Sequence, residues 1–188
     1  NNSWGCPTLE GCDPDSLKPA VTALRAAGIF IVASAGNDGE GGCNTVADPI
    51  ALYDESFSVG AHDSAGRVAG FSSRGAVTAD GSNRTKPDIL APGVSVLSAI
   101  PGDQYASYDG TSMAGPHVAG VVTLVWSANP DLIGQIAETE QILIETAVPY
   151  DYSTHGTPTC GDAATTPDNA VGYGLINAYE AVKMALGN

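Results

Sequence analysis

A serine lies between small residues at the start of an apolar stretch. Ser112 stands within the sequence Gly-Thr-Ser-Met-Ala-Gly at residues 110–115. The valine- and leucine-rich run 118–125 follows it and predicts a helix. The first N–H groups of a helix have no intrahelical partners and carry positive partial charge. A hydroxyl at this point, with small neighbours that let a substrate approach, is typical of a nucleophile.

A serine hydroxyl needs a base that takes its proton and donors that stabilise the oxyanion it creates. Asn37 is a candidate donor in the segment Ser-Ala-Gly-Asn-Asp-Gly at residues 34–39, directly after the apolar run 29–33. Open α/β sheets place their sites at this carboxyl edge. The uncharged amide of Asn37 and the backbone N–H of Ser112 would be the two donors. In the alternative interpretation, Asn37 only shapes a turn.

Short apolar runs predict the strands that position these residues. Residues 29–33 form a continuous β-branched run next to glycine, which is typical of a parallel strand buried on both faces. Residues 56–61 and 89–91 are further candidates, and residues 94–98 alternate in polarity as a half-exposed strand does. Because helices alternate with these strands, we predict a three-layer α/β/α fold with a mostly parallel central sheet. Residues 1–188 would form one domain or most of one.

Apolar residues at helical spacing predict the helices. The first helix covers residues 15–27, with Ser16 as its cap and Gly28 as its end. A long helix begins near Ser112. Two further helices are expected at residues 136–146 and 177–186. Between them, residues 149–172 are rich in Thr, Asp, Gly and Pro and are expected to form a loop.

The charge balance excludes some partners. The chain has 188 residues, and its 7 basic and 21 acidic residues give a formal net charge of −14. Nucleic acid is not an expected partner, because phosphate binding needs a basic surface. No run of apolar residues is long enough to span a membrane. The acidity is compatible with solubility, with calcium binding or with long-range attraction of basic substrates.

Four cysteines indicate an oxidising compartment, and hence a secreted protein. Their spacing leaves three disulfide pairings open. We favour Cys6–Cys12, which closes a short loop, together with Cys43–Cys160, which ties distant loops. A zinc site is the rival interpretation, but the chain has no Cys-x-x-Cys and only three histidines.

Five stretches in order resemble segments of the subtilisin-like serine proteases (subtilases, peptidase S8). The resemblance covers nearly the whole chain. The stretches are residues 1–5 (Asn-Asn-Ser-Trp-Gly), 32–37 (Val-Ala-Ser-Ala-Gly-Asn), 71–75 (Phe-Ser-Ser-Arg-Gly), 86–93 (Lys-Pro-Asp-Ile-Leu-Ala-Pro-Gly) and 110–120. The resemblance implies Ser112 as the nucleophile, Asn37 as an oxyanion donor and a polypeptide as the substrate. The residues that it implies to line the substrate cleft are Ser3, Trp4, Gly5, Ala33, Ser34, Ala35 and Gly36.

Some roles stay open beside this resemblance. The Thr111 hydroxyl could assist the oxyanion or cap the helix. Asp63 matches a position near a weak cation site in some subtilases, which implies a structural calcium ion, but an aspartate that ends a strand turn fits equally. The chemistry itself requires no cofactor. We assign residues 71–75 and 86–93 to structure, with Asp88 hydrogen-bonded locally.

None of the three histidines matches the catalytic base of the family. His117 lies five positions after Ser112, about 140° around the helix axis, so the two side chains cannot meet. We expect His117 to be packed and hydrogen-bonded, His62 to follow a strand and His155 to lie exposed in a loop. Subtilases place their Asp and His before the strand that ends at residues 3–5. The resemblance therefore implies that an N-terminal segment or chain of the same protease supplies both residues.

Two other classes of function remain as alternatives. Gly110-x-Ser112-x-Ala114 resembles the nucleophile elbow of an α/β-hydrolase esterase, with Asp131 or Asp151 and His155 as partners. An elbow requires a buried strand directly before the serine, and residues 104–108 are too polar for one. The other class is a non-catalytic product, either a nicked or truncated half or a pseudoprotease domain.

Overall fold

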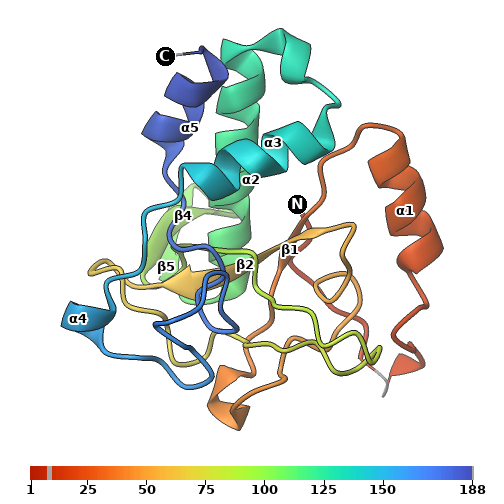
Figure 1. Cartoon of the computed structure of the whole chain (residues 1–188), viewed down its shortest axis with the longest axis vertical. Coiled ribbons are helices and arrows are strands. Elements are labelled where there is room, and N and C mark those ends of the chain that lie inside the picture. Colours follow the sequence, from red (N-terminus) through yellow and green to blue (C-terminus); the bar gives the residue numbers. More distant parts are fainter. Residues whose placement is uncertain (8–9, 188) are drawn as a thin grey trace.

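Three short parallel strands form the centre of the molecule (Figure 1). The computed structural model describes residues 1–7 and 10–187. The sheet has the order β1-β2-β3, with β1 at Val32–Ser34, β2 at Phe57–His62 and β3 at Ile89–Pro92. Single parallel bridges continue it at both edges, from Ala33 to Asn2 and from Leu90 to Leu175. The strand residues are almost all buried, as the apolar runs predict for a sheet covered on both faces.

The helices lie on both sides of this sheet. Helix α2 packs against all three strands, and α5 packs against α2 (Figure 1). Their shared core includes Val118 and Val125 of the helix and Val59 and Ile89 of the strands. In the described residues the helices are α1 at Lys18–Ala26, α2 at Thr111–Ala128, α3 at Ile136–Glu145, α4 at Tyr152–His155 and α5 at Ala178–Ala185. Short 3₁₀ turns cover Gly39–Gly41 and Pro130–Leu132.

A second core cluster lies on the opposite face of the sheet. Successive residues of a strand point to opposite faces, so Val32 joins the core beneath α2 while Ile31 and Ala33 face the other way. There they pack with Val21 of α1 and with the buried Tyr53. Helices on one face and α1 with its loops on the other give the predicted α/β architecture with a parallel sheet.

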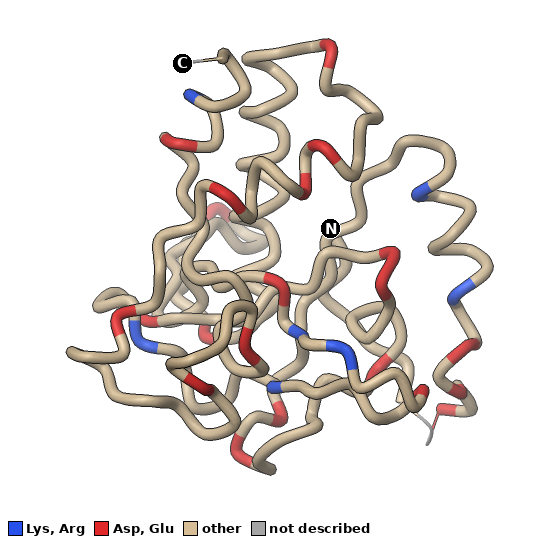
Figure 2. Tube along the Cα trace, viewed as in Figure 1, with Lys and Arg blue, Asp and Glu red and all other residues tan. Residues whose placement is uncertain are grey.

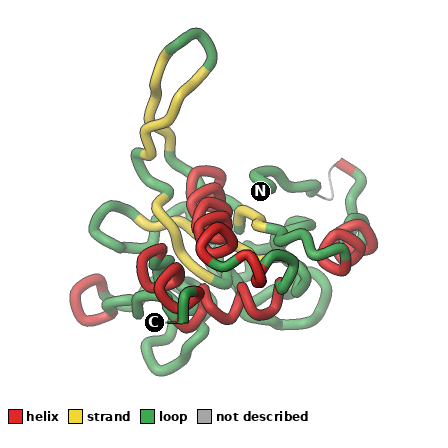
Figure 3. Tube along the Cα trace, turned by 90° about the horizontal axis from the view of Figure 1, so that it is seen from above, coloured by secondary structure: helices red, strands yellow, loops and turns green. Residues whose placement is uncertain are grey.

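A hairpin that the sequence predicted only in part projects from the molecule (Figure 3). Strands β4 at Val96–Ile100 and β5 at Gln104–Tyr108 pair in antiparallel fashion. The strand expected over residues 94–98 is therefore shifted by two residues. Residues 104–108 are a strand after all, but an exposed one: Tyr105 is 72% exposed.

Two local predictions were wrong. Ser16 does not cap α1, which begins at Lys18 after Leu17. Instead the Ser16 hydroxyl accepts a hydrogen bond from the Asp13 N–H in the preceding turn. The segment 149–172 is not all loop, because it contains the one-turn helix α4. There the Asp151 carboxylate accepts hydrogen bonds from two backbone N–H groups, which satisfies donors that a helix start leaves free.

Acidic residues are spread along the whole fold rather than gathered on one face (Figure 2). Basic residues are few by comparison, as the net charge of −14 requires. In the part of the chain that the structure describes, none of the helices is both long and apolar enough to cross a membrane.

Candidate active site

A pocket of about 290 Å³ lies where three distant segments meet: the N-terminal residues, the loop after β1 and the start of α2. Both Asn37 and Ser112 line it, so the two side chains that the sequence analysis paired do share one cavity. The lining residues are Ser3, Trp4, Gly5, Ser34, Ala35, Gly36, Asn37, Asp38, Asp48, Ala51, Thr111 and Ser112.

Thr111 fixes the orientation of the Asn37 side chain. The Asn37 Oδ1 accepts a hydrogen bond from the Thr111 backbone N–H at 2.9 Å, and the Thr111 Oγ1 lies 3.1 Å away. The Thr111 hydroxyl also accepts from the Gly36 N–H at 3.2 Å. Gly110, not Thr111, is the N-cap of α2, and no side chain caps the helix. The hydroxyl of Thr111 therefore does not cap the helix but holds the loop that carries Asn37.

Because Oδ1 is engaged by Thr111, the amide nitrogen of Asn37 remains available. Gly110 has no side chain. If it carried a Cβ atom, that atom would lie 3.8 Å from Asn37 Nδ2 and 3.7 Å from the Ser112 backbone nitrogen. Both nitrogens thus flank the same position next to the Ser112 backbone. Two N–H donors this close to a helix start can together stabilise a negative oxygen if both point at it.

The N-terminal segment is bonded to both other walls of the pocket. Asn2 exchanges backbone hydrogen bonds with β1, donating to the Val32 carbonyl at 2.8 Å and accepting from Ser34 at 2.9 Å. The hydroxyl of Ser34 donates to the Thr111 carbonyl at 2.9 Å, and that of Ser3 donates to the Ser112 carbonyl at 3.3 Å.

The predicted cleft residues divide into two groups. Ser3, Trp4 and Gly5 lie in the pocket with Ser34, Ala35, Gly36 and Thr111. Ala33 lies outside it, because its side chain faces the second core cluster and is only 2% exposed. Trp4 is 55% exposed and forms an open wall.

Ser73 holds the loop of Asn37 from behind. The Ser73 N–H donates to the Gly36 carbonyl at 3.0 Å, and its hydroxyl accepts from the Asp38 N–H at 3.0 Å. These two bonds bracket Asn37 on both sides. The Phe-Ser-Ser-Arg-Gly stretch thus supports the pocket without lining it.

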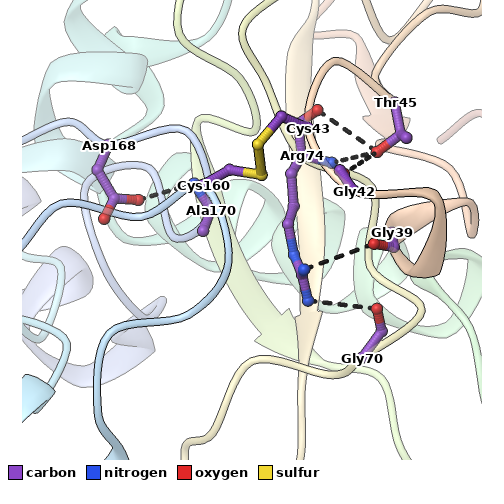
Figure 4. The surroundings of a disulfide bond; sticks show 9 residues. All are labelled: Gly39, Gly42, Cys43, Thr45, Gly70, Arg74, Cys160, Asp168 and Ala170. Carbon is purple, nitrogen blue, oxygen red and sulfur yellow. Dashed lines mark hydrogen bonds between the residues drawn. A yellow bond between two sulfur atoms is a disulfide. The ribbon is translucent and has the colours of Figure 1, made fainter.

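The loop continues to a disulfide that joins it to the C-terminal part of the chain (Figure 4). Cys43 pairs with Cys160, and Cys6 pairs with Cys12, which confirms the favoured pairing among the three. Arg74 extends beside the Cys43–Cys160 bond and points its guanidinium group at the carbonyl oxygens of Gly39, at 3.5 Å, and of Gly70, at 3.3 Å (Figure 4). Burial lowers the pKa of Arg74.

No histidine forms a hydrogen bond with Ser112 in the described parts of the chain. His117 is exposed rather than packed as expected, and its Nδ1 lies 2.8 Å from the Met113 carbonyl oxygen, one turn earlier in α2. His62 ends β2, and burial lowers its pKa. The His155 ring lies tilted beside the Tyr150 ring, with 5.6 Å between ring centroids, and His155 is half-buried rather than exposed.

Two carboxylates outside the pocket serve local structure. Asp63 Oδ1 accepts hydrogen bonds from the N–H groups of Ala65 and Arg67, which is the arrangement of an aspartate that ends a strand turn. Asp88 accepts from the Ser58 N–H and pairs with the buried Lys86, at 2.6 Å each. Within residues 1–7 and 10–187, no three His, Cys, Asp or Glu side chains are grouped so that they could hold a metal ion.

Sequence reasoning missed three pocket residues. Asp38 follows Asn37 directly, so its place in the same loop was a signal for it. Asp48 and Ala51 come from a later irregular segment and face the pocket only because that segment folds back beneath Gly5. No periodicity or motif in the sequence marks them.

The α/β-hydrolase interpretation does not fit this site. The strand before Ser112 is β5, an exposed member of an antiparallel hairpin, whereas an elbow needs a buried strand there. Asp151 is bonded to the start of α4 rather than to a histidine.

Comparison with known proteins agrees with the geometry. The model of the subtilase family (peptidase S8) matches residues 1–174, and the chain therefore belongs to this family of serine proteases. Bacillopeptidase F of Bacillus subtilis is 42% identical over 186 residues, which is 97% of this chain and 12% of that protein. Subtilisin DY of Bacillus licheniformis is 47% identical over 118 residues, 62% of this chain and 39% of that protein. The chain thus spans less than half the length of these relatives.

Two solved structures resemble the fold. The prenylagaramide maturation protease PagA has a TM-score of 0.70 and 26% identity, covering 89% of this chain and 54% of its own. The self-cleaved protease domain of PatA has a TM-score of 0.66 and 27% identity, covering 92% of this chain and 56% of its own.

Proposed function

We propose that this chain is the carboxyl-terminal portion of the catalytic domain of a secreted subtilisin-like endopeptidase. The observation that carries this proposal is the shared pocket of Asn37, Thr111 and Ser112 within the region that the family model matches. The two disulfides are in keeping with secretion, because such bonds persist in oxidising compartments.

In the proposed reaction, the Ser112 Oγ attacks the carbonyl carbon of a peptide bond and forms an acyl-enzyme. Asn37 Nδ2 and the Ser112 N–H hold the oxyanion of the tetrahedral intermediate. A histidine from a preceding segment of the same protease takes the Ser112 proton and returns it to the leaving amine, and an aspartate orients that histidine. Water then hydrolyses the acyl-enzyme. These steps require no cofactor.

The substrate would bind as an extended strand along the pocket walls. Backbone hydrogen bonds to an added strand supply affinity, and pockets for alternate side chains supply specificity. The short segment at Ser3 and Gly5 and the loop at Ala35 and Gly36 border the pocket on two sides, and they would form these contacts.

Labelling with a fluorophosphonate tests this proposal. Residues 1–188 alone should react slowly and cleave peptide amides hardly at all, because a triad acts as a unit and loss of the base removes most of its effect. The natural form that includes upstream sequence should be labelled rapidly and stoichiometrically at Ser112, and Ser112→Ala should abolish labelling.

Two outcomes would contradict it. Rapid stoichiometric labelling of residues 1–188 alone would show that no supplied base is needed. Absence of labelling and of hydrolysis in every natural form would instead establish the non-catalytic class.

A further inference from the structure

Two carboxylates line the candidate pocket, and the proposed reaction uses neither of them. Asp38 follows Asn37 in the loop after β1, and Asp48 comes from the segment beneath the N-terminal residues. Both face the same cavity of about 290 Å³ as Ser112. Among the described residues that line this cavity, none is Lys, Arg or His.

Asp48 is packed against the wall of the pocket. A Cβ atom on Gly5 would lie 2.5 Å from Asp48 Oδ2, so the carboxylate rests directly on the glycine backbone. The residue is half-buried. Among the described residues, no side chain or backbone N–H donates a hydrogen bond to its carboxylate, and none forms an ion pair with it.

The ionised form of Asp48 is disfavoured where it stands. Burial raises the pKa of its carboxyl group, and the negative charges of Asp38 and Glu10 raise it further. A carboxylate at such a place lacks a compensating cation. A positive group that entered the pocket would replace the lost hydration and relieve the repulsion between the two acids.

We propose that Asp48, together with Asp38, makes this pocket select a substrate side chain that ends in a positive charge, Lys or Arg, at the residue before the scissile bond. The inference rests on the proposed function, which places that residue beside Ser112. Trp4 forms an open apolar wall along which the methylene groups of a lysine or arginine can lie while the charged end reaches the acids. An acidic substrate side chain would be repelled.

The test compares substrates that differ in one charge. Peptide amides with lysine or with norleucine before the scissile bond are given to the natural form of the protease that includes residues 1–188. Lysine should be preferred about tenfold or more in kcat/KM, which corresponds to one hydrogen bond to a charged group. Asp48→Asn should remove most of this preference, mainly through KM, and Asp38→Asn should reduce it with little risk to folding because Asp38 is exposed.

Asp103→Asn is the matched control. It removes the same single charge from the exposed turn of the β4–β5 hairpin, and its left-handed backbone suits asparagine as well as aspartate. The lysine preference should survive this change. The proposal is overturned if the wild-type enzyme cleaves norleucine as well as lysine, or if both pocket variants keep the full preference.

A binding experiment separates this inference from the proposed function. Product-like peptides that end in lysine or norleucine are titrated calorimetrically against the Ser112→Ala variant of the same natural form. Tighter binding of the lysine peptide, lost in Ser112→Ala/Asp48→Asn, would support the pocket inference even where no form hydrolyses peptides. Equal binding of the two peptides would overturn it even where Ser112 is active.

Discussion

At the scale of single residues, Thr111 takes part in more of the hydrogen bonds around the pocket than Ser112 or Asn37 does. It is completely buried, and its backbone N–H and hydroxyl both lie within hydrogen-bond distance of Asn37 Oδ1. The hydroxyl also joins Gly36. These bonds occupy the Asn37 Oδ1 and leave its Nδ2 free, so the geometry of the proposed oxyanion donor depends on its neighbour Thr111.

Replacing Thr111 with valine should loosen this arrangement. The variant keeps the shape of the side chain but leaves the partly buried Gly36 N–H without its acceptor, which should cost about 1 kcal/mol in the free energy of unfolding. Urea denaturation measures the loss, and the rate of fluorophosphonate labelling at Ser112 should fall with it. Thr111→Ser retains the hydroxyl and should behave nearly as wild type. Equal loss in both variants would mean that the hydroxyl contributes little.

Asp48 should make the stability of the protein depend on pH. Its pKa is higher in the folded than in the unfolded chain, so the native state is relatively more stable below the unfolded value, and this advantage is lost as pH rises through the folded value. Asp48→Asn should therefore raise Tm at pH 7 and leave it unchanged near pH 3. We expect a gain below about 1 kcal/mol, because solvent screens a half-exposed carboxylate. A lower Tm at pH 7 would contradict this account.

At the scale of elements, an ion pair joins α1 to α3. Arg25 and Glu140 meet through two hydrogen bonds, of 2.5 and 2.6 Å, and both side chains are partly exposed. A planar guanidinium matches a carboxylate at two points, which a lysine ammonium cannot do. The pair therefore ties α1 directly to α3, two helices that are far apart in the sequence.

Arg25→Lys should weaken this connection. We expect a loss of about 1 kcal/mol in the free energy of unfolding at low salt and a smaller loss at high salt, because the pair is partly exposed. Thermal denaturation at two ionic strengths measures it. Glu180→Gln breaks the exposed pair with Lys183 within α5 and provides the comparison, with an expected effect below about 0.5 kcal/mol. Equal effects of the two variants would show that the two-point geometry adds nothing.

At the scale of the whole molecule, the Cys43–Cys160 bond links parts that are 117 positions apart in the chain. It anchors the loop that starts at Asn37 to the long C-terminal segment (Figure 4). The Cys6–Cys12 bond spans only 6 positions. Because a cross-link reduces the freedom of the unfolded chain more when it closes a longer loop, the two bonds should differ in their contribution to stability.

Removal of each disulfide measures this difference. Cys43→Ser/Cys160→Ser should lower the free energy of unfolding by about 5 kcal/mol, and Cys6→Ser/Cys12→Ser by about 2 kcal/mol, if chain entropy dominates. Urea denaturation without a reductant gives both values. A larger loss in the Cys6–Cys12 variant would contradict this explanation, and native-state effects would then have to account for it.

Local patterns predicted much of the fold. The buried strands, the start of α2 beside Ser112 and the end of α1 at Gly28 all follow from periodicity and from the conformational freedom of glycine, which adopts a φ of +78° there. The strand and helix limits moved by up to three residues, as with α1, because hydrogen bonds in the turn at Asp13 compete with the predicted cap. Residues 104–108 were judged too polar for a buried strand, and they form an exposed strand of the β4–β5 hairpin instead.

By itself, the sequence determined the α/β class and the family, and it marked Ser112 and Asn37 as candidate site residues, because these inferences depend on residue types at short, fixed spacings. Only the tertiary structure decided that Ala33 faces the core, that Thr111 orients Asn37 and that Asp48 lies in the same pocket as Ser112. The physical reason is that these relations join segments many residues apart. Their distances depend on how the sheet, the helices and the irregular loops pack together, and no local pattern records that packing.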